Sequence, residues 1–207
     1  MTIYPDSGDI FLDYVTWVSQ FDSGRFSNCT CWKNTCCNRA SNTILNIAGT
    51  STNRTQQIVI VTSGNSNCGN LSCVSDTYTF NTAIKAIDTS LYRHNLPIMI
   101  GVHHPKIKEN RLTKLLEYQD DYCAESNDPS ITNHYIVIVG KYYDSNRSKY
   151  YYRFYEVGTR NIDNGRSDKN RLYIEHPNHM VKGDTEYITY DNYYTLTEVR
   201  KNIGEEY

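Results

Sequence analysis

Apolar residues recur at helical spacing in the first half of the chain. One such segment runs up to Gly49, a helix stop signal, and predicts a helix over residues 37–48. Its apolar face consists of Ala40, Ile44, Leu45 and Ala48. A second segment follows the capping residues Ser75 and Asp76 and predicts another helix. Its apolar stripe consists of Phe80, Ala83, Ile84, Ile87 and Leu91. Residues 10–18, "IFLDYVTWV", predict a further short helix.

Strand patterns dominate the second half. "HYIVIVG" (residues 134–140) and "KYYYRFYEVG" (residues 149–158) flank the turn-like "YDSNRS", which predicts a hairpin. Residues 97–103 form a strand pattern before it, and "RLYIEH", "EYITY" and "YTLTEVR" form further ones after it. Residues 105–130 are polar, with one helical piece, "RLTKLLEYQ". Helices followed by antiparallel strands predict an α+β domain, with N-terminal helices packed on an antiparallel sheet.

Composition sets limits on the class of protein. The 207 residues contain no linker and no internal repeat, so we expect a single domain over residues 1–207. A formal net charge of -2 and a pI near 6.3 give no basic face for nucleic acid. No apolar run approaches the about 20 residues that cross a bilayer. The start of the chain does not resemble a signal peptide, so we expect export by another route or with a leader outside this sequence.

Seven cysteines are many for this length, and the odd number means that they cannot all pair within one chain. The run Cys29-x-Cys31…Cys36-Cys37 lacks the two C-x-x-C pairs of a zinc ribbon. The adjacent pair Cys36-Cys37 is compatible with a disulfide anchor, a metal ligand, a buried apolar residue or a nucleophile. The sequence around the pair distinguishes these.

Cys36 and Cys37 begin the predicted helix. The N-terminus of a helix carries partial positive charge, which favours the thiolate form of a cysteine placed there. The residues at helical spacing from Cys37 are small or apolar, whereas those from Cys36 begin with Arg39. Cys37 therefore shares the buried face. It is either a small buried hydrophobe or a nucleophile, and a nucleophile needs a base.

Among six histidines, His134 opens a strand, where its ring would lie at the edge of a cleft. If the hairpin is symmetric about Ser145, Glu156 lies directly across from His134 on the same face. The carboxylate would then fix the tautomer of the ring and stabilise the imidazolium. A register slip of one residue would instead turn Glu156 to solvent.

A cysteine on a helix, a histidine on a strand and a carboxylate on the next strand make the chain resemble papain-like cysteine peptidases. "NTCCNRASNTIL", "NHYIVIVGKYYD" and "YYYRFYEVGT" more narrowly resemble a bacterial group that includes bacteriocin-leader peptidases and cell-wall amidases, over roughly residues 28–158. The resemblance implies a papain-like fold, with Cys37 as nucleophile, His134 as general base and Glu156 as orienting acid.

The chain departs from that family at two points. The acid is a glutamate rather than the commoner aspartate or asparagine. The family has an oxyanion-binding glutamine about six residues before its nucleophile, where this chain has Cys31, or Thr30 if Cys36 is the nucleophile. Asn28, Asn34 and the backbone N–H of Cys37 are the alternative donors.

The function expected by analogy is a cysteine hydrolase that cleaves amide bonds, first of all in peptidoglycan peptides. Some small enzymes of the resembled group are antibacterial toxins delivered without a signal peptide, act in the periplasm or cell wall, and meet an immunity or inhibitor protein. The sequence predicts no cofactor and no metal. The pairs His103-His104 and His176/His179 are poorly spaced to share an ion.

The competing class is a non-catalytic module that binds glycan or protein. The chain has 19 tyrosines, many of them in strand patterns. Tyrosine favours packing on a sheet, which is the simpler interpretation, but a tyrosine-lined groove could also stack sugars. In that class the cysteines would be structural.

Overall fold

The computed structural model of the protein describes residues 8–26, 35–60, 76–103, 106–109, 116–119, 132–186 and 194–205. The helices are α1 (Ser23–Phe26), α2 (Thr35–Ile47), α3 (Thr77–Asp88) and α4 (Ile162–Gly165), with a π-turn over Thr89–Arg93 and a 3-10 turn over His176–Asn178. The strands are β1 (Ile10–Phe11), β2 (Thr52–Val59), β3 (Ile98–His103), β4 (Lys106–Glu109), β5 (Leu116–Gln119), β6 (His134–Asp144), β7 (Lys149–Tyr155), β8 (Arg171–Glu175), β9 (Met180–Asp184) and β10 (Tyr194–Asn202).

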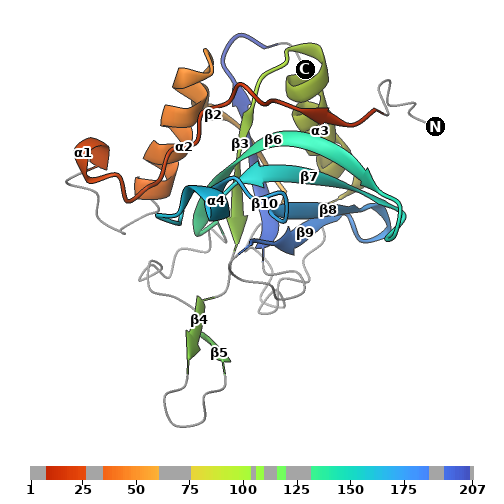
Figure 1. Ribbon diagram of the computed structural model, residues 1–207. Coiled ribbons are helices and arrows are strands. Elements are labelled where there is room, and N and C mark those ends of the chain that lie inside the picture. Colours follow the sequence, from red (N-terminus) through yellow and green to blue (C-terminus); the bar gives the residue numbers. More distant parts are fainter. Residues whose placement is uncertain are drawn as a thin grey trace.

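Six antiparallel strands close on themselves into a barrel (Figure 1). Their order is β6, β3, β10, β9, β8 and β7, and β7 pairs again with β6. β1 adds to the edge of β6, and β2 pairs with β10. The hairpin β4–β5 extends away from one end of the barrel (Figure 1).

The expected papain-like α+β fold, with N-terminal helices on an antiparallel sheet, is therefore wrong. Closure depends on β8, β9 and β10, which fold back after β7 and bring β10 between β9 and β3. Strand twist accumulates along such a series, so a sheet that has both edges paired becomes a barrel. Local patterns identified two of these three strands, but the pairing of β10 with β3 joins segments far apart in the sequence.

A ring contact identifies the inner face of the barrel. Phe154 on β7 and Tyr194 on β10 have ring centroids 5.8 Å apart, although β7 and β10 are not neighbouring strands. Their contact therefore crosses the lumen. Because side chains alternate along a strand, Tyr152, two residues before Phe154, also faces inward. Ile138 pairs with Phe154 and so faces inward too, and Ile136, two residues before it, does the same.

The two long helices were predicted correctly. α2 packs against β6 and β3, and α3 packs against β10 and β2. Asp76 caps α3 by accepting a hydrogen bond from the backbone N–H of Thr79, 2.9 Å away. The carboxylate of Asp88, at the other end of α3, binds Lys141 at 2.7 Å and the hydroxyl of Tyr152 at 2.9 Å. These two bonds tie the C-terminal end of α3 to β6 and β7.

Two other helix predictions were wrong. In residues 10–18 the chain forms β1 and then an irregular segment, because the backbone pairs with β6: the N–H of Leu12 donates to the carbonyl of Val139 at 2.9 Å. The final part of "RLTKLLEYQ" is the strand β5, paired with β4. In both places a neighbouring strand supplied hydrogen bonds that overrode the local helical pattern.

Several strand tyrosines pack on one another. Tyr142, Tyr151 and Tyr173 lie opposite each other on β6, β7 and β8, with ring centroids 5.5 and 5.4 Å apart. The guanidinium of Arg171 lies over the ring of Tyr151 and that of Arg147 over the ring of Tyr173. For this row the simpler interpretation, packing on a sheet, is confirmed.

Candidate active site

Cys37 lies in the first turn of α2, and its side chain is buried. Ala40, Ile44 and Leu45 are buried on the same face, as their spacing predicts. Cys36 is disulfide-bonded, whereas Cys37 retains its thiol. Of the two adjacent cysteines, only Cys37 can therefore act as a nucleophile. The other five cysteines lie outside the described residues.

His134 is the first residue of β6, and its ring is buried. Nε2 of the ring lies 2.8 Å from Oε1 of Glu156. The ring also forms a side-chain hydrogen bond with Cys37. Since Nε2 binds the carboxylate, Nδ1 remains for the sulfur. The structure thus brings the three sequence-predicted residues together in the order thiol, imidazole, carboxylate.

The register of the hairpin differs from the expected one. Its turn comprises residues 145–148, and Val137 pairs with Tyr155, so the ladder extended by one residue places Glu156 opposite Ile136. His134 lies two residues further along the same face. The carboxylate therefore reaches the imidazole along a diagonal. A diagonal separation is longer than that of a direct pair, which accounts for a glutamate in place of a shorter acid.

Glu156 is fully buried, and both of its oxygens are hydrogen-bonded. Oε1 accepts from His134 and from the backbone N–H of Gly158, and Oε2 accepts from the hydroxyl of Tyr194 at 2.6 Å. Burial alone would raise the pKa of Glu156. The positive charge of His134 and the three hydrogen bonds outweigh burial, so the pKa lies below its ordinary value. The carboxylate is therefore ionised at neutral pH.

His134 is held in its charged form. Burial acts to lower the pKa of His134, but the carboxylate of Glu156 and the side chain of Cys37 raise it to about 10. At neutral pH the ring is an imidazolium between a carboxylate and a sulfur. An imidazolium in that position stabilises a thiolate, which is the reactive form of cysteine.

Three residues of the site carried no recognised signal in the sequence. Tyr194 and Gly158 bind the carboxylate, and Trp17 donates from Nε1 to the backbone carbonyl of Glu156 at 2.7 Å. Gly158 follows Glu156 in "EVG", and a small residue two positions after the acid is a weak hint of close approach. Nothing local distinguishes Tyr194 from the other tyrosines or Trp17 from a core residue.

The oxyanion-binding group is partly outside the described residues. Asn28, Thr30, Cys31 and Asn34 all fall there. Cys37 lies in the first turn of α2, at the positive end of the helix dipole. This end of the helix favours a developing negative charge beside the sulfur.

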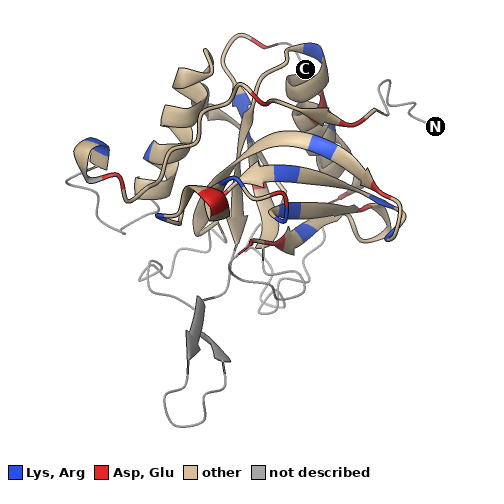
Figure 2. Ribbon diagram, viewed as in Figure 1, with Lys and Arg blue, Asp and Glu red and all other residues tan. Residues whose placement is uncertain are grey.

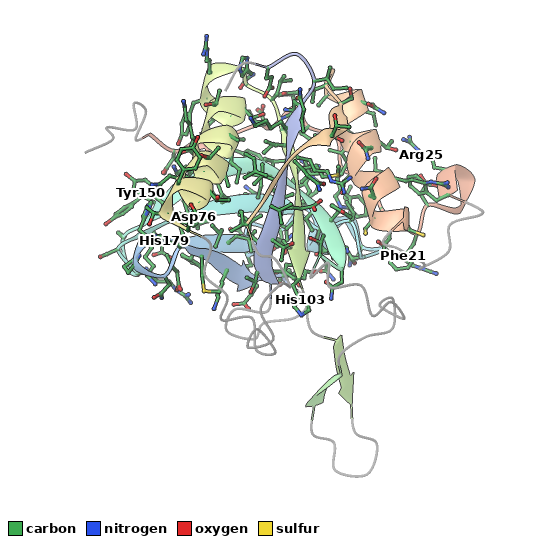
Figure 3. All side chains as sticks on the ribbon, turned by 180° about the vertical axis from the view of Figure 1, so that it is seen from behind. Phe21, Arg25, Asp76, His103, Tyr150 and His179 are labelled. Carbon is green, nitrogen blue, oxygen red and sulfur yellow. The ribbon has the colours of Figure 1, made fainter. Side chains whose placement is uncertain are left out.

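The pair His176/His179 lies against α3, apart from this site. His176 and His179 pack their rings against Phe80 at centroid distances of 5.8 and 5.4 Å. Figure 3 shows His179 near Asp76 at the start of α3, and His103 at the end of the barrel from which β4–β5 extends. His104 lies outside the described residues. Within the described ranges, no group of three or more His, Cys, Asp or Glu side chains is arranged to hold a metal ion.

Basic and acidic residues are interspersed over the described parts of the ribbon (Figure 2). In the parts of the chain that the structure describes, the helices are too short or too polar to cross a membrane. No protein-family model, curated protein or solved structure matches the chain.

Proposed function

We propose that the protein is a cysteine hydrolase that cleaves amide bonds, with Cys37 as nucleophile, His134 as general base and acid, and Glu156 as the orienting carboxylate. One observation carries this proposal: the imidazole of His134 bonds the thiol of Cys37 on one side and the carboxylate of Glu156 on the other. Thiol and base are the groups that nucleophilic catalysis by cysteine requires, and the acid orients the base. The resemblance to papain-like enzymes supports the proposal through these residues and not through the fold.

The reaction would proceed in two steps. The Cys37 thiolate attacks the carbonyl carbon, and the positive N-terminal end of α2 stabilises the oxyanion. Collapse of the tetrahedral intermediate breaks the C–N bond, and His134 gives its proton to the departing amine, leaving a thioester on Cys37. A water molecule then gives a proton to His134 and attacks the thioester. The acid is released, and the thiolate–imidazolium pair is restored.

Peptidoglycan peptides are the substrate class that we propose first, by analogy with the bacterial group resembled in sequence. The enzyme would then act in the periplasm or cell wall as a secreted or delivered antibacterial effector, and an immunity or inhibitor protein would protect the producing cell. The disulfide at Cys36 supports a location outside the reducing cytosol, where disulfides persist.

The test is digestion of purified peptidoglycan by the wild-type protein and by Cys37→Ala. The wild type should release new amino or carboxyl termini, identifiable by mass spectrometry of the soluble fragments, and Cys37→Ala should release none. Lys149→Ala is the matched control, because its ion pair with Glu175 is on the surface far along the hairpin from His134. Equal digestion by Cys37→Ala and the wild type would refute the proposal.

A non-catalytic glycan- or protein-binding module is the second candidate. The row of Tyr142, Tyr151 and Tyr173 across β6, β7 and β8 suits this function, because aromatic rings that pack on one another on a sheet face can also support sugars. Sedimentation of the protein with insoluble peptidoglycan separates the two functions. If the protein is only a binding module, the wild type and Cys37→Ala should sediment equally with peptidoglycan, and neither should cut it.

A further inference from the structure

Tyr194 reaches the site from a strand that is not adjacent to either of its partners' strands. It opens β10, whereas His134 opens β6 and Glu156 follows β7. Its hydroxyl donates to Oε2 of Glu156 at 2.6 Å, and its ring lies 5.8 Å from the ring of His134, centroid to centroid. The side chain is almost fully buried. Tyr194 therefore holds the carboxylate from across the mouth of the barrel.

The hydrogen bond from Tyr194 fixes the orientation of the Glu156 carboxylate, which the other hydrogen bonds of the site do not fix. Glu156 has three rotatable side-chain bonds and reaches His134 along a diagonal. His134 and Gly158 both bind Oε1, so they leave the rotation of the carboxylate about that oxygen unconstrained. The hydroxyl of Tyr194 binds the other oxygen and stops this rotation. It also gives a hydrogen bond to a buried, charged oxygen that would otherwise be costly to desolvate.

We propose that Tyr194 is a positioning residue of the catalytic group, which keeps Glu156 ionised and aimed at His134 and thereby maintains the imidazolium beside Cys37. The inference rests on the proposed function. Cys37 from α2 and Glu156 after β7 bond His134 directly, and Tyr194 acts through Glu156. Loss of the hydroxyl would weaken the imidazolium without removing any of the three reacting groups.

The experiment measures alkylation of Cys37 by iodoacetate as a function of pH, with mass spectrometry of the peptide that contains Cys37. This reagent is an anion, so it reacts fastest with a thiolate that has an imidazolium beside it. The rate should rise and then fall with pH, and the alkaline fall reports the loss of the His134 proton. In Tyr194→Phe the alkaline fall should occur about one pH unit lower than in the wild type.

Tyr155→Phe is the matched control. Tyr155 is also fully buried, directly before Glu156, but its hydroxyl has no hydrogen-bond partner within the described residues. Removal of that hydroxyl should leave the alkaline fall unchanged. A fall at the same pH in Tyr194→Phe and the wild type would overturn the role of Tyr194 while leaving the proposed function intact.

Two further results separate a failure of the proposed function from a failure of the role of Tyr194. If the wild-type rate only rises with pH, as for an ordinary thiol, the thiolate–imidazolium pair and the proposed function fail together with the inference. If Tyr194→Phe does not fold, a fluorinated tyrosine at position 194 keeps the ring and makes the hydroxyl a stronger donor. The alkaline fall should then move to higher pH, and an unmoved fall would overturn the inference.

Discussion

The backbone N–H of Gly158 donates to Oε1 of Glu156, and the glycine leaves room for that carboxylate. A Cβ at position 158 would lie 2.7 Å from Oε1 of Glu156 and 3.3 Å from Cε1 of His134. Gly158→Ala should therefore push the carboxylate off the imidazole and lower kcat/KM by about tenfold to a hundredfold. Hydrolysis of peptidoglycan fragments measures the effect.

Gly8→Ala is the control for the cost of an added methyl group, since a Cβ at Gly8 meets no atom within 4 Å. Its rate should equal that of the wild type. A Gly158→Ala enzyme as fast as Gly8→Ala would show that the carboxylate tolerates displacement.

The diagonal reach of Glu156 predicts an unusual response to shortening. Glu156→Asp keeps the charge but loses one methylene, so its carboxylate should fall short of Nε2 of His134. Glu156→Gln keeps the length but loses the charge. We expect both variants to lose kcat by about a hundredfold or more. Near-wild-type kcat for Glu156→Asp would mean that charge alone, and not reach, is required at this position.

The pKa values of the buried pair predict how stability varies with pH. The pKa of His134 is raised from 6.5 to about 10, so its stabilising effect is complete below pH 6.5 and is lost as the pH rises through 10. The pKa of Glu156 is lowered from 4.5, so its effect is present above pH 4.5 and is lost as the pH falls through its folded-state value. The pair stabilises the fold most between pH 4.5 and 6.5.

Urea unfolding of Cys37→Ala checks this, because the variant leaves the pair of His134 and Glu156 without the thiol. The free energy of unfolding should decrease above pH 6.5, by at most about 1.4 kcal/mol per pH unit. The decrease should be smaller in Cys37→Ala/Glu156→Gln, which lacks the charge that holds the proton on His134. Parallel curves for the two proteins would contradict the pairing.

The ion pair between Asp88 and Lys141 predicts that removal of one partner strongly destabilises the fold. Both side chains are largely buried, and burial raises the pKa of Asp88 although Lys141 opposes it. Asp88→Ala would leave the ammonium of Lys141 buried and without this carboxylate, at a cost of about 3–5 kcal/mol. Thermal unfolding should show a clear drop in Tm.

The double variant Asp88→Ala/Lys141→Met should recover part of that stability, because it removes both charges. Lys149→Ala, which breaks a surface ion pair with Glu175, should cost about 1 kcal/mol or less. An Asp88→Ala protein as stable as Lys149→Ala would show that the buried pair does not hold α3 to the barrel.

The sequence predicted the contact between His134 and Glu156 although it predicted the wrong fold, for a physical reason. The expected register paired His134 with Glu156 directly, and the observed one is displaced by two residues. Because side chains alternate with a period of two, an even displacement leaves both residues on the same face. The partnership survived the error, whereas a displacement of one residue would have destroyed it.

Barrel closure and the role of Tyr194 depend on contacts that no local pattern encodes. Helices α2 and α3 and the β6–β7 hairpin are specified by neighbouring residues, through apolar spacing, a cap and a turn. The pairing of β10 with β3 brings together residues such as Val199 and Ile100, and it follows from how all six strands fit around one lumen. That geometry is a property of the whole chain.

Tyr194 lies 38 residues beyond Glu156, on the strand that is synthesised after every other strand of the barrel. A growing chain that already contains Cys37, His134 and Glu156 still lacks the strand that closes the barrel and the hydroxyl that binds Oε2 of Glu156. Assembly of the complete site therefore waits until β10 has left the ribosome, so cotranslational folding can produce the helices and the β6–β7 hairpin before it produces the site.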